Sequence, residues 1–475
     1  MKTLSRLFLP AAAGILLSLH AFPQTGGEHG FLTGSWLGKL KVQSLELTFI
    51  LNFSFNEKDS LTVTIDSPDQ GAKDLPTSKV SFREDSVLVY SRKLNGVYKA
   101  RILKDEGRME GTWAQGPYSF PLTVIHQEKP YAVNRPQEPK PPFPYLTEEV
   151  SIPNAQGGNT LSGTLTIPEG TGPFPAAVLI TGSGPQDRNE EIFQHKPFLL
   201  LADWLTRHGI LVLRYDDRGI GKSTGNFSAG TTFDFATDAL AAFYYLKTRK
   251  EADTGKIGLI GHSEGAIIAS LNAASNKEIG FIVLMAGTAV PGDKLLLEQT
   301  ALIGKASGMN DREIAEAQKL NGRIYSVLKK EKDTGKAEKK ILAILQKSNR
   351  EQQKKGDTVA SEKELEMQAK TLVAPWLRTF VALNPFLYLE KVSCPVLALD
   401  GELDLQVPPK ENLEAIERAL IFAGNSHYET VLFPKLNHLF QTATTGAPDE
   451  YGKIEETIAP AVLEKISDWI LSEIK

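Results

Sequence analysis

The sequence predicts an α/β fold in which a doubly wound, mostly parallel sheet with a helical insertion follows a small antiparallel β domain. Three observations lead to this prediction. Between residues 34 and 126, short runs of alternating apolar and polar residues are separated by polar turns, which is typical of antiparallel sheets. From residue 147 onwards, apolar strand-like runs alternate with helical patterns, which is typical of parallel sheets. A Lys- and Glu-rich segment of helical periodicity, from about residue 291 to 386, interrupts this alternation.

Length and charge narrow the class of protein. At 475 residues the chain is long enough for roughly three structural units. Hydrophobic residues make up 41% and charged residues 23% of the chain, which excludes a disordered or fibrous protein. The formal net charge is -4, so there is no basic surplus that would bind nucleic acid or anionic lipid. We therefore expect a small-molecule partner and no nucleic acid.

The first 23 residues have the pattern of a signal peptide. Lys2 and Arg6 precede an apolar run at residues 7–19, and small and polar residues follow it. The run is shorter than the roughly 20 residues that span a bilayer, so we expect cleavage between Ala21 and Gln24 and no stable membrane insertion. The alternative is a permanent membrane anchor. Because Cys394 is the only cysteine, no intramolecular disulfide is possible. The predicted location is the periplasm or the outside of the cell.

Residues 24–127 are predicted to form a β-sandwich or barrel that serves as an accessory domain. Its β-rich runs lie at residues 47–55, 61–65, 80–82, 86–90, 97–103 and 120–125. No catalytic constellation is found in it, and a glycan or a lipid is a candidate contact. Residues 128–146 follow as a linker, semi-rigid because proline disfavours helix and extends the chain.

Residues 147–475 are predicted to form the catalytic α/β domain. Residues 147–152 and 161–167 could pair as an opening antiparallel hairpin, and residues 176–181 form the first buried strand. The insertion at about 291–386 is too long for a loop. Because active sites of such sheets lie at the carboxyl ends of the strands, we expect the insertion to cap the site; the alternative is a surface helix bundle.

The strongest motif is Gly261-His262-Ser263-Glu264-Gly265. It lies between an apolar strand and a helical pattern, as in the G-x-S-x-G elbow, where the turn exposes the serine hydroxyl and the glycines allow close chain approach. The amide of Glu264, at the start of the helix, is expected to donate to an oxyanion. Ser263 is thus the predicted nucleophile.

A serine nucleophile needs a base and an acid that orients the base. Chain order in this class is serine, acid, histidine, which leaves His427 and His438. His438 follows the strand at residues 430–433 and reaches the carboxyl edge of the sheet, whereas His427 precedes that strand. The strand at residues 396–399 is followed by three acids, Asp400, Glu402 and Asp404. Asp404 is preferred because it lies beyond the strand end, whereas Asp400 ends the strand and more plausibly organises the turn.

The second oxyanion donor should come from the loop after residues 176–180. The amide of Ser183 is the first candidate and that of Gly184 the alternative. Two glycine-rich turns are not nucleotide sites: the phosphate-loop pattern needs glycine where Asp216 stands, and the dinucleotide pattern needs it where Asp187 stands. We expect no cofactor and no metal.

These motifs resemble those of a known family. The region from about residue 147 to 475 is similar to bacterial α/β-hydrolases of the serine-aminopeptidase-like superfamily, in particular the carboxylesterase branch. The shared segments are Gly182 to Pro185 with Asp187 and Arg188, the turn from Asp217 to Ser223, and the elbow. The resemblance implies a triad of Ser263, Asp404 and His438 that acts on esters with modest acyl groups. The sequence departs at Ala266, where many relatives have glycine.

These observations leave three candidate functions for the protein. The leading one is hydrolysis of carboxylic esters through an acyl-enzyme intermediate. The second is a serine aminopeptidase or another acyl hydrolase acting on small peptides or amides, for which Glu362, Glu364 and Glu366 could bind an amine, although charge runs are usually solvated. The third is a non-catalytic binding protein. Trp376 and Phe380 are candidate substrate-binding residues, although aromatic residues at helical spacing are more often plain core.

Overall fold

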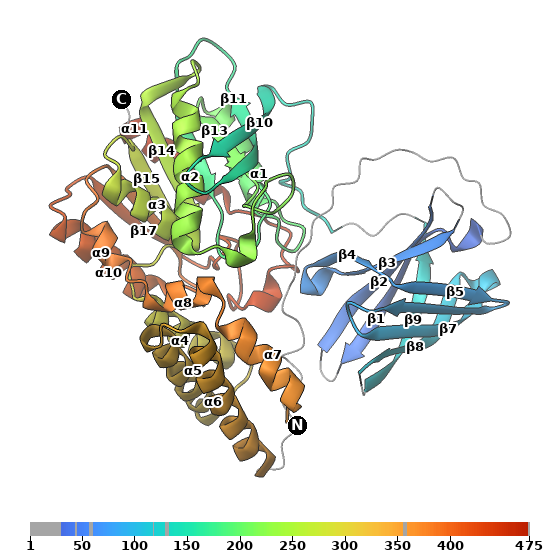
Figure 1. Cartoon of the computed structure of the whole chain (residues 1–475). Coiled ribbons are helices and arrows are strands. Elements are labelled where there is room, and N and C mark those ends of the chain that lie inside the picture. Colours follow the sequence, from blue (N-terminus) through green and yellow to red (C-terminus); the bar gives the residue numbers. More distant parts are fainter. Residues whose placement is uncertain are drawn as a thin grey trace.

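The computed structural model describes residues 30–42, 45–56, 60–116, 118–128, 133–354 and 359–473. The predicted signal peptide lies outside these residues. Figure 1 shows an N-terminal sheet in blue, an α/β part in green, yellow and red, and a helical insertion in brown and orange. Within the described ranges, no helix has both the length and the apolar character that crossing a membrane requires.

The N-terminal part is one antiparallel sheet, with strand order β4-β3-β2-β1-β9-β8-β7-β6-β5 in the described residues. Its strands are β1 (Gly34–Val42), β2 (Leu45–Phe55), β3 (Leu61–Ser67), β4 (Ala72–Pro76), β5 (Lys79–Arg83), β6 (Ser86–Ser91), β7 (Gly96–Leu103), β8 (Arg108–Gln115) and β9 (Tyr118–Gln127). β3 lies close to β5 at the opposite end of the sheet, so the sheet curls around a core that includes Trp36, Tyr98 and Trp113. The domain is therefore a half-open barrel, and the sandwich alternative is wrong because no second sheet faces this one in the described part of the chain.

The larger sheet has the strand order β10-β11-β13-β12-β14-β15-β16-β17. Its strands are β10 (Leu146–Asn154), β11 (Asn159–Ile167), β12 (Phe174–Ile180), β13 (Leu211–Tyr215), β14 (Ala252–His262), β15 (Phe281–Met285), β16 (Val396–Gly401) and β17 (Tyr428–Phe433). β10 and β11 form the predicted antiparallel hairpin, β11 pairs antiparallel with β13, and the remaining pairs are parallel. The central strands are buried on both faces, which explains their continuous apolar sequences.

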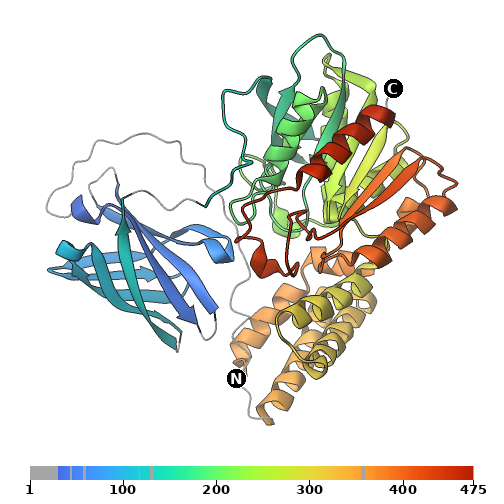
Figure 2. The same ribbon diagram turned by 180° about the vertical axis from the view of Figure 1, so that it is seen from behind.

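Helices cover both faces of this sheet. One face packs on α2 (Thr232–Lys247), α3 (Glu264–Ser275) and α10 (Pro409–Phe422). The other packs on α1 (Pro197–Arg207) and α11 (Pro460–Glu473), which are seen in green and dark red from behind in Figure 2. This two-sided cover is the doubly wound arrangement that the sequence predicts.

The insertion between β15 and β16 is a group of helices with a core of its own. It consists of α4 (Gly292–Ala306), α5 (Asp311–Lys330), α6 (Thr334–Lys354), α7 (Glu362–Leu372) and α8 (Pro375–Ala382), and the short α9 (Phe386–Leu389) leads back to the sheet. Ile324, Ile341 and Leu365 are buried between these helices. α8 lies against α2 and the short helix η4 (Phe227–Ala229), so the insertion contacts the main domain where its strands end.

The segment between the two sheets is fastened to the α/β part. Arg135 is buried and donates hydrogen bonds to the carbonyl groups of Ile454 (2.9 Å), Phe193 (2.8 Å) and Gly452 (3.0 Å). The β domain reaches the same place, because a Cβ atom added to Gly71 would lie 3.4 Å from the ring of Phe193. The loops of Phe193 and Gly452 therefore both lie against the β domain, since a Cβ atom on Gly452 would lie 3.5 Å from the carbonyl oxygen of Pro68.

Candidate active site

Ser263 occupies the turn between β14 and α3, as the motif predicts. Its backbone has φ 54° and ψ −114°, a conformation that a residue with a side chain adopts only when the surroundings enforce it. The amide of Ser263 donates to the carbonyl of Met285 (2.8 Å). A Cβ atom on Gly261 would lie 2.0 Å from the carbonyl oxygen of Gly265, and one on Gly265 would lie 2.1 Å from that of Ile180. The two glycines are thus required by close backbone approach.

His438 and Asp404 form a buried pair beyond the ends of β17 and β16. The Nδ1 atom of His438 lies 2.6 Å from Oδ2 of Asp404, and the other carboxylate oxygen accepts the amides of Gln406 (2.7 Å) and Val407 (2.8 Å). The carboxylate is therefore fixed by the backbone and in turn orients the imidazole of His438. His427 lies at the opposite end of β17, where its carbonyl accepts the amide of Val396.

Asp400, the alternative acid, has a different environment. It is fully buried, its Oδ1 accepts the amide of Gly401 (2.8 Å), and its Oδ2 has no hydrogen-bond partner among the described residues. Burial, together with the negative charge of nearby Asp404, raises the pKa of Asp400 well above its ordinary value. The shift favours the neutral acid, and the described chain places no hydrogen bond between Asp400 and His438.

The structure brings the elbow and the His438 loop together without a direct bond between Ser263 and His438 in the described residues. The contact is made by His262, whose ring centroid lies 4.9 Å from that of His438 and whose Nε2 is 3.0 Å from the carbonyl oxygen of His438. Catalytic hydrogen bonds are often long without substrate and tighten in the reacting complex. The three predicted residues therefore lie at the same carboxyl edge of the sheet.

The loop after β12 lies beside Ser263. A Cβ atom on Gly182 would lie 3.4 Å from Cβ of Ser263. The amide of Gly182 is already used, because it donates to Oε1 of Glu190 (2.7 Å). The amides of Ser183 and Glu264 make no hydrogen bond within the described chain, which agrees with a role as oxyanion donors. Gly184, the alternative donor, has φ 102°, a conformation that favours glycine.

Trp376 joins the helical insertion to the elbow. Its indole N–H lies 2.9 Å from each carboxylate oxygen of Glu264, and the hydroxyl of Thr232 donates to Oε1 of the same carboxylate (2.6 Å). Phe380, one turn further along α8, stacks on Trp376 with centroids 5.1 Å apart and is buried in the main core. Trp376 thus contacts the elbow directly, whereas Phe380 contacts it only through Trp376 in these interactions.

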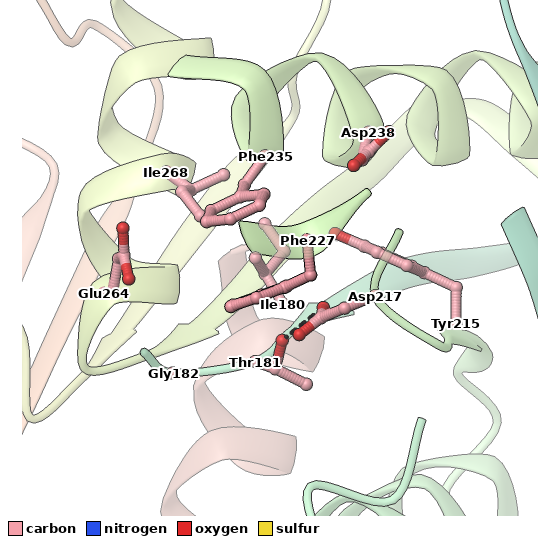
Figure 3. A pocket seen from close by; sticks show the side chains of 10 residues that line it. All are labelled: Ile180, Thr181, Gly182, Tyr215, Asp217, Phe227, Phe235, Asp238, Glu264 and Ile268. Atoms are coloured by element: carbon pink, nitrogen blue, oxygen red, sulfur yellow. Dashed lines mark hydrogen bonds between the residues drawn. The ribbon is translucent and has the colours of Figure 1, made fainter. Parts of the chain in front are cut away.

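A small cavity of about 10 Å³, room for about one water molecule, lies beside Glu264. Figure 3 shows its walls, which include Phe227, Phe235 and Ile268 and the bond from the hydroxyl of Thr181 to Asp217 (2.9 Å). Trp376 and Phe380 are not among its lining residues. The role of Trp376 and Phe380 in substrate binding stays a prediction.

Glu264 makes stability depend on pH. Burial raises its pKa to about 6, although the bonds from Thr232 and Trp376 favour the charged form. Because the pKa is higher in the folded than in the unfolded chain, the folded protein binds more protons between about pH 4.5 and 6, so stability rises as pH falls through this window. We predict that Glu264→Gln, which has no charge to bury, unfolds with a higher free energy than wild type at pH 7.5. This advantage should shrink by about 2 kcal/mol at pH 4.5.

Urea unfolding of both proteins at the two pH values measures this difference. The exposed Glu366 on α7 offers the control, since Glu366→Gln should give no such pH-dependent difference from wild type. A difference between Glu264→Gln and wild type that is the same at both pH values would contradict the assignment.

Sequence reasoning missed two residues at this site. Glu190 binds both the Gly182 amide and Nδ1 of His262 (2.9 Å), yet it lies in a polar stretch with no motif that marks it. His262 occupies a variable position of the elbow pattern, where no function is implied. Two buried ion pairs hold the neighbouring loops: Arg188 pairs with Asp216 (2.8 Å) and Arg218 with Asp238 (2.6 Å).

An elbow serine after a central parallel strand, with an acid and a histidine after the last two strands, defines the class of α/β hydrolases. The chain belongs to the serine aminopeptidase S33 family, whose model matches residues 197–441. This match confirms the predicted relationship to serine-aminopeptidase-like hydrolases.

Several known proteins are similar to this chain. Esterase EstD of Thermotoga maritima is 28% identical over 320 residues, which cover 66% of this chain and 66% of the relative, slightly less than two thirds of its length. Among solved structures, the Pyrococcus furiosus esterase Pf2001 is 16% identical, covers 72% of this chain and 98% of its own, and has a TM-score of 0.43. Est1E from Butyrivibrio proteoclasticus with bound ferulic acid is 16% identical over 68% of this chain and 99% of its own, with a TM-score of 0.38.

Proposed function

We propose that the protein is a carboxylesterase-type serine hydrolase that cleaves carboxylic esters of small molecules through an acyl-enzyme intermediate. The observation that carries the proposal is the buried His438–Asp404 pair (2.6 Å), which lies at the same sheet edge as a serine in the strained elbow conformation. A hydroxyl group is a weak nucleophile unless a base takes its proton, and this arrangement offers that base. The similarity to Esterase EstD supports the choice of an ester as substrate.

Each residue has a defined part in the proposed reaction. Nε2 of His438 takes the proton of Ser263 as Oγ attacks the ester carbonyl, and Asp404 stabilises the imidazolium that forms. The amides of Ser183 and Glu264 donate to the oxyanion. His438 then protonates the leaving alcohol, and water, activated by the same imidazole, releases the acid and restores Ser263.

The aminopeptidase alternative is less well supported. An aminopeptidase needs an acidic group that is available to the amine of its substrate. Both oxygens of the Glu264 carboxylate are engaged by Trp376 and Thr232, and Glu364 is engaged by Ser361 at the start of α7. Glu362 and Glu366 are exposed on the same helix, as expected for a solvated charge run. The third alternative, a binding protein, does not explain why His438 and Asp404 are paired beside the elbow.

Parallel assays separate these functions. We expect the wild-type protein to hydrolyse p-nitrophenyl acetate and butyrate with a kcat/KM at least about 10²-fold above that for aminoacyl p-nitroanilides, since without an amine-binding group the anilides lose positioning. Faster turnover of the anilides would favour the aminopeptidase, and no turnover of either would favour the binding protein. Heat-denatured protein is the control.

Export to the periplasm or the medium is proposed on the signal-peptide pattern of the first 23 residues. The helical insertion is proposed to act as a cap, because it emerges at the carboxyl end of β15 and its Trp376 contacts Glu264, next to the nucleophile. Contact of the N-terminal β domain with a glycan or a lipid stays a prediction.

A further inference from the structure

His262 is a buried histidine whose two ring nitrogens both face acceptors. Its Nδ1 lies 2.9 Å from Oε1 of Glu190, and its Nε2 lies 3.0 Å from the carbonyl oxygen of His438. A backbone carbonyl can only accept, so Nε2 must carry a hydrogen. The same Oε1 of Glu190 also accepts the amide of Gly182 (2.7 Å), as suits an ionised carboxylate. With Glu190 ionised, both nitrogens are satisfied only when His262 is an imidazolium ion.

The electrostatic environment agrees with a charged His262. Burial by itself lowers the pKa of His262, but the charge and hydrogen bond of Glu190 outweigh it, and the pKa is raised. His195, on the same loop as Glu190, shows the opposite case. It is also buried, but its partners include Thr457 and the carbonyl of Tyr451, and burial together with the nearby charge of Arg135 lowers its pKa to about 4. The pKa values of two buried histidines near one loop are thus shifted in opposite directions.

Glu190 is held firmly in place for this contact. It is 4% exposed and has φ 52°, which is uncommon for a residue with a side chain. Its amide donates to the carbonyl of Asp187 (2.9 Å), and the Asp187 carboxylate accepts the amides of Asn189 and Glu191. Such conformations persist only where the surrounding structure fixes them, and they gather at functional sites.

We propose that Glu190 and His262 are positioning residues, a buried ion pair that fastens the Gly182 loop and the backbone of His438 to the nucleophile elbow. The three segments come from the ends of β12, β14 and β17, and they carry the Ser183 oxyanion donor, Ser263 and the base. The ion pair therefore sets the distance of the oxyanion donor and of the imidazole from Ser263. The inference rests on the proposed function, because positions matter only if these groups react.

Loss of the charge should disturb this arrangement in a defined way. In Glu190→Gln the His262 ring is expected to be neutral and to carry one hydrogen. If that hydrogen is on Nδ1, the lone pair of Nε2 faces the His438 carbonyl; if it is on Nε2, Nδ1 no longer donates to residue 190. With either tautomer His262 loses its bond to residue 190 or its bond to the His438 carbonyl, so the loop of Gly182 or the loop of His438 is no longer tied to the elbow. Misplacement by about 1 Å can cost about 10²-fold in rate.

The experiment compares full-length Glu190→Gln, His262→Asn, Ser263→Ala and the matched control His195→Gln with wild type, using p-nitrophenyl butyrate. We expect kcat of Glu190→Gln and His262→Asn to fall by about 10²-fold with KM within about threefold, because small-ester binding is separate from transition-state geometry. Affinity for an alkyl trifluoromethyl ketone, which adds to the serine as a transition-state mimic, should fall in parallel. His195→Gln loses a buried histidine and should lose thermal stability while keeping kcat.

The outcomes separate this inference from the proposed function. Wild-type turnover by Ser263→Ala would overturn the proposed function itself. Inactive Ser263→Ala together with wild-type kcat in Glu190→Gln and His262→Asn would overturn only the positioning role, as would an unchanged ketone affinity when kcat falls. If Glu190→Gln folds poorly, His262→Asn decides, because it retains Glu190 and its bond to Gly182 while it removes the imidazole that links Glu190 to the His438 backbone.

Discussion

Ser263→Ala is expected to lower kcat for p-nitrophenyl esters by about 10⁴- to 10⁶-fold while the fold is retained. The substitution removes the only atom that forms the acyl-enzyme bond. The small side chain at φ 54° still fits the turn, and the amide bond to Met285 is untouched. Residual turnover should come from the oxyanion donors alone. Initial-rate assays with circular dichroism spectra of both proteins measure the effect.

Ser275→Ala is the matched control for this prediction. Ser275 lies at the end of the same helix, α3, and its hydroxyl bonds only to the carbonyls of Leu271 and Asn272 among the described groups. It should keep wild-type kcat. Ester hydrolysis by Ser263→Ala within tenfold of wild type, roughly the range that an uninvolved residue would show, would remove Ser263 from the mechanism.

The second large effect is expected at the acid. Asp404→Asn should lower kcat by about 10³- to 10⁴-fold, because an amide cannot stabilise the imidazolium and favours the wrong tautomer of His438. Asp400→Asn should stay within about tenfold, since burial raises the pKa of Asp400 and so favours the neutral acid, which Asn resembles. The two variants make the same substitution at two buried positions, of which only Asp404 bonds to His438 in the described chain.

Steady-state kinetics and thermal unfolding of both variants give the result. A loss of kcat in Asp400→Asn equal to or larger than that in Asp404→Asn would show that the oriented carboxylate is Asp400. A loss in both that follows their melting temperatures would indicate damage to the turn instead of a role in catalysis.

The features that local sequence determines were predictable. The elbow needs only a strand, a tight turn and a helix, all of which lie between residues 252 and 275. The side of the sheet on which His438 lies follows from the direction of β17. The choice of Asp404 over Asp400 rests on one residue being inside the strand and the other beyond it, and the structure has this arrangement.

Contacts between distant segments were not predictable. Glu190 meets His262 across 72 residues, and Trp376 meets Glu264 across 112, so no spacing in the sequence links them. In the β domain, the strands predicted from the sequence do not include β1, β4 and β8. These strands contain glycines, charged residues and a proline, which have low strand propensity. Their place is set by pairing with neighbouring strands instead.

The most direct test of the central claim is the site of covalent modification by a fluorophosphonate. The tryptic peptide of residues 257–277 contains Ser263, Ser270 and Ser275, and fragment-ion masses distinguish them. We predict stoichiometric phosphonylation of Ser263 in native protein, strong slowing in Asp404→Asn and His438→Ala, and none after heat denaturation. Modification of a different residue, or no modification by a protein that still hydrolyses esters, would contradict a mechanism in which Ser263 is activated by His438 and Asp404.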